Sequence, residues 1–100
     1  MNKIELTFQY FDGCPHAGTL RKSVKEAIAG FEESIVYEEE LIDTQELAIK
    51  NKFRGSPTLL INGEDFDNMP LPEHPALACR FYPYGVPSKE KITERLKKFI

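Results

Sequence analysis

The segment Phe11-Asp12-Gly13-Cys14-Pro15-His16-Ala17 places a cysteine between a stretch with strand periodicity and one with helical periodicity. Pro15 suits the first position of a helix, because its fixed φ and missing N–H cost nothing there. Cys14 is therefore predicted at the N-cap, beside unpaired backbone N–H groups and the positive end of the helix dipole. Such surroundings stabilise the thiolate and lower a thiol pKa from its usual value of about 8.5. Cys14 is thus the candidate nucleophile for thiol–disulfide exchange.

Two further residues bear on this thiol. His16 falls in the first turn of the predicted helix, where a positive charge would help to hold Cys14 as thiolate; a solvated histidine is an equally good interpretation. Cys79 is the second of two cysteines, and a strand cysteine is most often a small buried residue. Cys79 would lie about 10 Å along its strand from the strand end that is nearest Cys14. The two Cα atoms of a disulfide lie within about 7 Å of each other. A Cys14–Cys79 bond therefore requires the strand or the preceding loop to shift, and both assignments of Cys79 stay open.

Other charged and soft side chains offer binding chemistry. Arg54 and Arg80 could bind a carboxylate of a partner, and solubility explains them equally well. Cys14, His16, His74 and Cys79 would be soft ligands for zinc, copper(I) or mercury(II). Their spacing contains no Cys-x-x-Cys pair, so no metal and no bound cofactor are predicted, and soft-metal binding is kept as an alternative.

The elements that position these residues follow from the periodicity of the apolar side chains. The patterns predict strands over 4–10, 35–42, 58–61 and 78–82, and helices that begin near residues 15, 43 and 88, with Asp43 and Ser88 as N-caps of the last two. Asn62-Gly63 predicts a hairpin turn, with the return strand delayed by a proline-rich excursion over 64–77. The order βαβαββα predicts an α/β fold with a mixed four-stranded sheet and helices on both faces.

Composition favours a single compact domain over residues 1–100, with 41% hydrophobic and 29% charged residues. The net charge is −3, and Lys and Arg are scattered among acidic residues, which argues against nucleic-acid binding. No apolar run approaches the roughly 18 residues of a membrane span, and the first residues lack the apolar core of a signal peptide. We therefore expect a soluble cytoplasmic protein without membrane contact.

Four segments carry a resemblance to a known superfamily. The Cys14-Pro15 helix start after the first strand, followed by Gly55-Ser56-Pro57-Thr58 at the third, resembles the thioredoxin and glutaredoxin superfamily. With Ala78-Cys79-Arg80 and Gly85-Val86-Pro87-Ser88, the chain is similar to small bacterial thioredoxin-like proteins. The resemblance covers most of the chain and implies a thioredoxin-like fold.

The resemblance also implies the geometry of a site. It implies a cis Ser56–Pro57 bond close to Cys14, and a Ser56 backbone that contacts an incoming peptide or glutathione. An aromatic ring at Phe11 is expected to be exposed beside the thiol and to line an apolar groove. The predicted partner contacts are Phe11, Pro15, Ser56, Pro57 and Thr58.

The active-site motif departs from the family's Cys-x-x-Cys pattern. Here the motif reads Cys14-Pro15-His16-Ala17, so the local resolving cysteine is absent. We therefore predict a monothiol protein, whose Cys14 forms mixed disulfides with a disulfide-containing protein or a glutathione-like thiol. As an enzyme it would be a thiol–disulfide oxidoreductase. The alternatives are a redox-inactive thioredoxin-like binding module and the soft-metal protein described above.

Overall fold

The protein is described by a computed structural model over residues 3–99. Its elements are β1 (Ile4–Tyr10), α1 (Ala17–Ile28), a short 3-10 turn (Glu32–Ser34), β2 (Ile35–Leu41), α2 (Gln45–Asn51), β3 (Thr58–Ile61), β4 (Glu64–Asp65) and α3 (Lys89–Lys97). The strands form one sheet in the order β2-β1-β3-β4, in which β1 and β2 are parallel and the other pairs antiparallel. This confirms the predicted α/β class and mixed four-stranded sheet.

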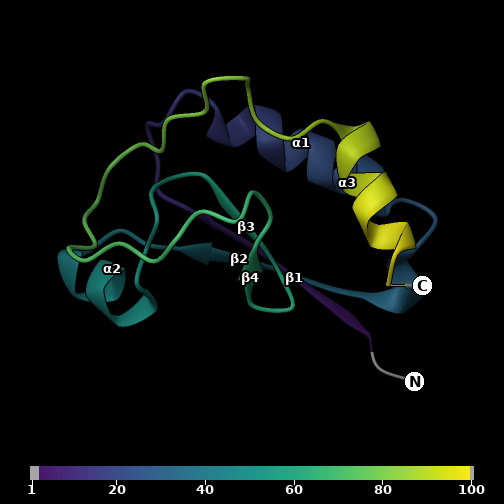
Figure 1. Cartoon of the computed structure of the whole chain (residues 1–100), viewed down its shortest axis with the longest axis horizontal. Coiled ribbons are helices and arrows are strands. Elements are labelled where there is room, and N and C mark those ends of the chain that lie inside the picture. The colour runs from purple at the N-terminus through teal and green to yellow at the C-terminus, as the bar shows by residue number, and fades with distance from the viewer. Residues whose placement is uncertain (1–2, 100) are drawn as a thin grey trace.

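The main core lies between the sheet and two helices. Alternate residues of β1 share one buried cluster with residues of α1 and α3. The two helices pack against each other (Figure 1). The members of this core with 0% exposure are Leu6, Phe8, Leu20, Val24, Ile92 and Leu96. Burying each such side chain contributes about 1.5 to 3 kcal/mol relative to leaving it exposed. The core thereby fixes where α1 starts, and so where the loop that carries Cys14 lies.

A second, smaller apolar cluster surrounds α2, which lies apart from the other two helices (Figure 1). Its buried members are Ile42, Ala48 and Phe53, with Phe11 and Leu47 packed against them. The chain enters this cluster directly after β2 and leaves it toward β3. The cluster therefore supports the segment that follows β2 and the segment that precedes β3.

Two helix starts illustrate local capping. The hydroxyl of Ser88 accepts the Lys91 N–H at 3.2 Å, which confirms the predicted N-cap of α3. The predicted N-cap of α2 at Asp43 is wrong by one residue, since the Thr44 hydroxyl accepts the Leu47 N–H at 3.1 Å. Across the described residues, every helix is too short or too polar to cross a membrane.

The return strand predicted over 78–82 is wrong. After the turn at Asn62-Gly63 the chain returns at once as β4, which is only two residues long. The Asp65 carboxylate then accepts the backbone N–H groups of Asp67 and Met69, at 3.0 and 2.9 Å, and this bends the chain out of the sheet. The long irregular stretch up to α3 is therefore free to fold back over the sheet end near Cys14.

Candidate active site

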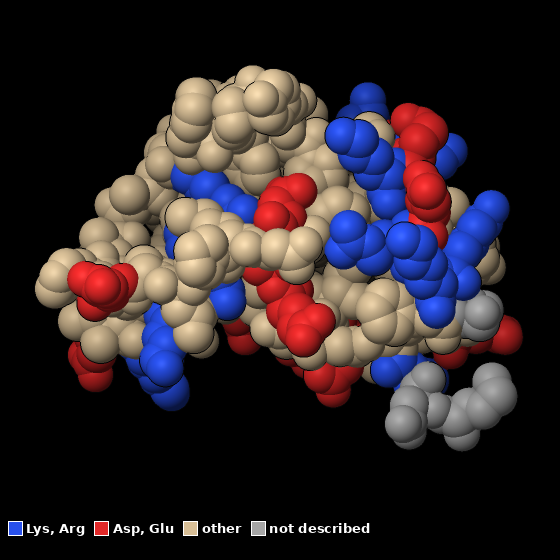
Figure 2. Space-filling view, viewed as in Figure 1, with Lys and Arg blue, Asp and Glu red and all other residues tan. Residues whose placement is uncertain are grey.

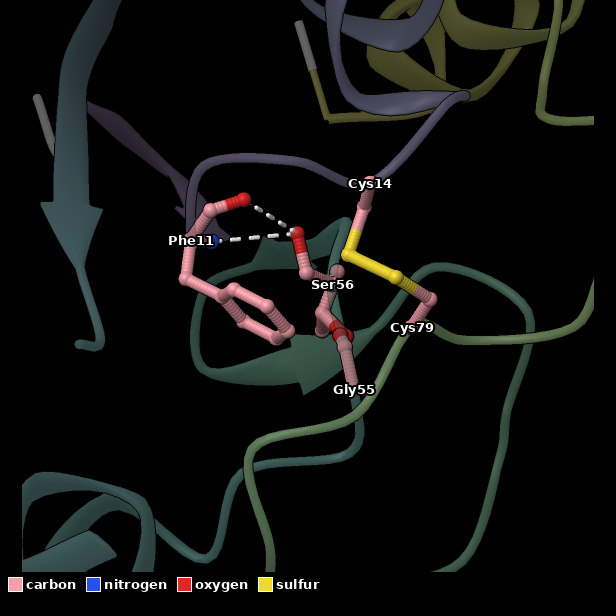
Figure 3. Close-up of a disulfide and its surroundings, with 6 residues drawn as sticks. Phe11, Cys14, Gly55, Ser56 and Cys79 are labelled. Atoms are coloured by element: carbon pink, nitrogen blue, oxygen red, sulfur yellow. Dashed lines mark hydrogen bonds between the residues drawn. A yellow bond between two sulfur atoms is a disulfide. The ribbon is translucent and has the colours of Figure 1, made fainter. Parts of the chain in front are cut away.

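Cys14 and Cys79 form a disulfide, with their Cα atoms 5.5 Å apart (Figure 3). Cys14, in the loop between β1 and α1, is buried, whereas Cys79 is an exposed residue of the irregular stretch. The predicted separation, and the interpretation of Cys79 as a core residue, are wrong because 78–82 is not a strand of the sheet. The single-cysteine site predicted from the sequence is therefore corrected: the second sulfur comes from the same chain.

Cys79 reaches Cys14 because its neighbours pair with the backbone of Ser56. The Ser56 N–H donates to the Ala78 carbonyl at 2.9 Å, and the Arg80 N–H donates to the Ser56 carbonyl at 2.8 Å. These two hydrogen bonds form an isolated parallel bridge between Ser56 and Cys79. Cys79, which lies between the two bonded neighbours, is thus carried to the loop before β3, next to the loop that holds Cys14.

Arg80 anchors the same segment with its side chain. Its guanidinium donates to both carboxylate oxygens of Asp65, at 2.6 and 3.0 Å, and to the Thr58 hydroxyl at 3.3 Å. The Arg80 and Asp65 side chains are 5% and 2% exposed. Arg80 therefore binds a carboxylate of its own chain rather than that of a partner. The role of Asp65 carried no sequence signal, because it depends on the fold bringing β4 and residue 80 together.

The protonation state of this pair follows from its contacts. Burial by itself would raise the pKa of the Asp65 carboxyl, but the hydrogen bonds from Arg80 and from the Met69 N–H outweigh it. They hold that pKa below its ordinary value of 3.8. Burial would likewise lower the pKa of Arg80, yet the Asp65 hydrogen bond raises it. The pair is ionised at neutral pH.

The residues before β3 lie beside the disulfide but are covered. The Ser56–Pro57 peptide bond is cis, as the resemblance implies. The Ser56 hydroxyl accepts the Phe11 N–H at 3.1 Å and donates to the Phe11 carbonyl at 3.4 Å, which joins the two loops (Figure 3). Ser56 and Thr58 are 0% exposed, and Pro57 is also fully buried. In this disulfide-bonded form the three residues are covered by their own chain.

The predicted start of the first helix needs correction. α1 begins at Ala17, with His16 at its N-cap and no capping hydrogen bond from the His16 side chain. Cys14 lies two residues before this N-cap, and its carbonyl accepts the Ala17 N–H at 3.3 Å in a turn. Because the effect of a helix dipole falls off within the first turn, its influence on Cys14 is smaller than predicted. Pro15 and His16 are exposed on this turn.

Phe11 also differs from its predicted surroundings. It is half-buried, and its ring packs edge-on against Phe53 with centroids 6.3 Å apart. The ring belongs to the cluster around α2 and is not the freely exposed aromatic residue that was expected.

As for metal ligands, nowhere in residues 3–99 do three His, Cys, Asp or Glu side chains gather in a group that could hold an ion.

The accessible side of the disulfide is the side of Cys79. A hollow of about 290 Å³ has Cys79, Phe53, Met69, His74 and Phe81 among its lining residues. Next to it, the loop that leads to α3 carries two aromatic side chains, Phe81 and Tyr84, that are 82% and 96% exposed. Figure 2 shows an uncharged surface at this loop, and Lys and Arg side chains with some acidic ones over α3. An apolar surface therefore borders the disulfide.

Gly55 is required where the Arg80 backbone approaches. A Cβ on Gly55 would lie 3.0 Å from the Arg80 Cβ, and its φ is +104°. Gly13 has nearly the same φ, +101°, with open space around it, and so is a matched control. Gly13→Ala is expected to cost about 1 to 3 kcal/mol from backbone strain alone. Gly55→Ala should cost a further 1 to 3 kcal/mol, roughly, from overpacking. Urea unfolding of both variants measures the difference in stability. Equal losses of stability would mean that Arg80 moves away from the added methyl group without a cost in free energy.

Comparisons with known proteins identify the fold. No family model and no curated protein matches the chain. The solved structure of a chloroplastic thioredoxin z matches with a TM-score of 0.63 at 15% identity, over 97% of this chain and 78% of that one. Deadhead, a germline-specific thioredoxin of Drosophila melanogaster, matches with a TM-score of 0.62 at 17% identity, over 99% of this chain and 83% of that one. The chain has a thioredoxin-like fold.

Proposed function

We propose that this protein carries out thiol–disulfide exchange through Cys14 and Cys79. The proposal depends above all on the disulfide between them, which is accessible from the side of Cys79 and lies close to the cis Ser56–Pro57 bond. An external thiolate attacks one sulfur, forms a mixed disulfide with it and releases the other as thiolate. A second external thiolate then attacks the mixed disulfide, which leaves both cysteines reduced and the two external sulfurs joined. In the reverse direction the two cysteines reduce the disulfide of a partner.

The proposed partner is a disulfide-containing protein or a small thiol of the glutathione type. The exposed Phe81 and Tyr84, close in sequence to Cys79, would supply apolar contact to a protein partner. We propose a cytoplasmic location, where disulfides are generally transient and serve catalysis or sensing. In that compartment the Cys14–Cys79 bond would open and close in a cycle. The exposed His16, two residues from Cys14, is proposed to tune the thiol.

Equilibration of the oxidised protein in millimolar glutathione buffers tests the exchange. The disulfide is expected to open and reform within minutes, read as a two-proton mass change after acid quenching. The Cys79→Ser variant retains one reactive sulfur and should accumulate a single glutathione adduct on Cys14. The Cys14→Ser/Cys79→Ser variant is the control without adducts. The proposal would be contradicted if the disulfide withstood glutathione for hours in the folded protein but was reduced in urea. The protein would then be a binding module that the disulfide stabilises.

The thiol pKa separates exchange from soft-metal binding. In the reduced protein, the rate of iodoacetamide alkylation at each cysteine is measured as a function of pH. For at least one cysteine the rate should rise with an apparent pKa well below that of a free thiol, which is about 8.5. An unshifted pKa, together with zinc or mercury(II) binding that survives competition by glutathione, would favour the metal-binding alternative.

A further inference from the structure

We infer that Arg80 is a positioning residue for the exchange reaction: it holds Cys79 against the Cys14 loop after the disulfide has been reduced. This inference rests on the proposed function. Arg80 is not one of the two reacting residues, yet its hydrogen bonds to Ser56 and Asp65 determine how readily the two sulfurs meet again.

The contacts of Arg80 are made by its own backbone and side chain and involve neither sulfur atom. Its backbone N–H is bonded to the Ser56 carbonyl at 2.8 Å, and its guanidinium to Asp65 at 2.6 and 3.0 Å. Because Cys79 precedes Arg80 directly, both contacts fix the position of the cysteine backbone. None of these contacts is made through a sulfur atom, so breaking the S–S bond does not remove an atom from any of them. We call this set, Ser56, Asp65 and Arg80, the Arg80 clamp.

Further contacts hold the clamp on both sides. Asp65 is held by the N–H groups of Asp67 and Met69, so its carboxylate presents a fixed pair of acceptors to the guanidinium. On the far side of Arg80, the Tyr82 hydroxyl donates to the Pro57 carbonyl at 2.6 Å. The guanidinium lies 4.9 Å from the centroid of the Tyr82 ring. The segment after Cys79 is thus bound to β4 and to the loop before β3 at successive points.

Such a clamp changes the redox equilibrium of the disulfide. Closing an intramolecular disulfide is favoured in proportion to the effective concentration of one sulfur near the other, and a pre-positioned segment keeps that concentration high. Loosening the segment in the reduced protein lowers it. A tenfold fall in effective concentration corresponds to a rise of about 30 mV in the reduction potential, because two electrons are transferred.

Two conservative variants test the clamp by this potential. Arg80→Lys keeps the charge but loses the two-pronged donor geometry, and Asp65→Asn keeps the shape but loses the acceptor charge. Each is expected to lower the effective concentration about tenfold or more in glutathione buffers. The matched control is Arg21→Lys, which alters the more exposed Arg21–Glu39 pair and should leave the potential unchanged. A residue that serves stability alone would lower the melting temperatures of the oxidised and reduced forms equally and leave the potential at the wild-type value. That result would overturn the inference.

Hydrogen exchange in the reduced wild-type protein tests the clamp without any variant. The protein is reduced with a phosphine in urea and refolded. The Ser56 and Arg80 amides are then expected to remain protected, because their bonds to Ala78 and Ser56 persist. Exchange at the rate of an unstructured peptide would mean that the segment frays once the disulfide opens, and would overturn the inference. Failure of the clamp and failure of the proposed function are therefore distinguishable. Unprotected amides in the reduced protein contradict the clamp, whereas a disulfide inert to glutathione contradicts the proposed function alone.

Discussion

Reducing the disulfide, or replacing Cys79 by serine, is expected to lower the free energy of unfolding by about 4 kcal/mol. The two cysteines are 65 residues apart, so the bond closes a large loop of the unfolded chain. In the chain-entropy model this closure restricts the unfolded state and leaves the folded contacts unchanged. The measurement is urea unfolding at pH 7 of the oxidised protein, the reduced protein and the Cys79→Ser variant.

The Cys14→Ser/Cys79→Ser variant is the control, because reductant should not change its unfolding midpoint. The reduced wild-type protein and this variant are expected to unfold at similar urea concentrations. An oxidised protein no more stable than the reduced one would mean that strain in the folded state cancels the entropic gain. In that case the bond would contribute to exchange without contributing to stability.

Replacing Arg80 by methionine is expected to cost about 3 to 5 kcal/mol, since it leaves the Asp65 carboxylate buried without its partner. The Asp65→Asn/Arg80→Met variant should cost less than this single change, because no uncompensated charge remains. The control is Arg21→Met, which breaks an ion pair whose side chains are 32% and 28% exposed and should cost only about 1 kcal/mol. Equal losses for Arg80→Met and Arg21→Met would contradict the importance of burial.

The same pair predicts how stability depends on pH. The pKa of Asp65 is lower in the folded protein than its ordinary value of 3.8. The unfolded state therefore binds the proton more readily, and acid favours unfolding. The contribution of Asp65 is fully present above this ordinary value and is lost as the pH falls through the lower folded pKa. Urea midpoints measured between neutral and acidic pH should fall more steeply at the acid end for wild type than for Asp65→Asn; parallel curves would contradict the shift.

Most of the fold could be predicted from local patterns. The alternation from Ile4 to Tyr10 predicted β1 because one face of a strand is buried, and the Ser88 hydroxyl predicted the start of α3 because it satisfies a free N–H group. The largely apolar residues at 78–82 were predicted as a strand of the sheet, but they bond some of their backbone groups to Ser56 instead. The hairpin is completed by the polar residues Glu64 and Asp65, which strand propensity does not favour.

The site was predicted in its parts and missed in its assembly. Ser56 and Pro57 lie close to Cys14, as the resemblance implied. What was missed is that Cys79 joins them and that a buried Arg80–Asp65 pair holds the joining segment. An Asp-Arg pair 15 residues apart has no local signature, because neither residue differs in sequence from an ordinary surface charge.

The sequence by itself determined the order of strands and helices, since periodicity and capping act between residues a few positions apart. It also determined that Cys14 would lie between β1 and α1. Only the tertiary structure decided the partner of that cysteine. The approach of Cys79 depends on backbone hydrogen bonds to Ser56 and on a salt bridge to Asp65, both formed between segments distant in the chain. Such contacts depend on how the chain folds back over the sheet, and side-chain periodicity carries no record of that path.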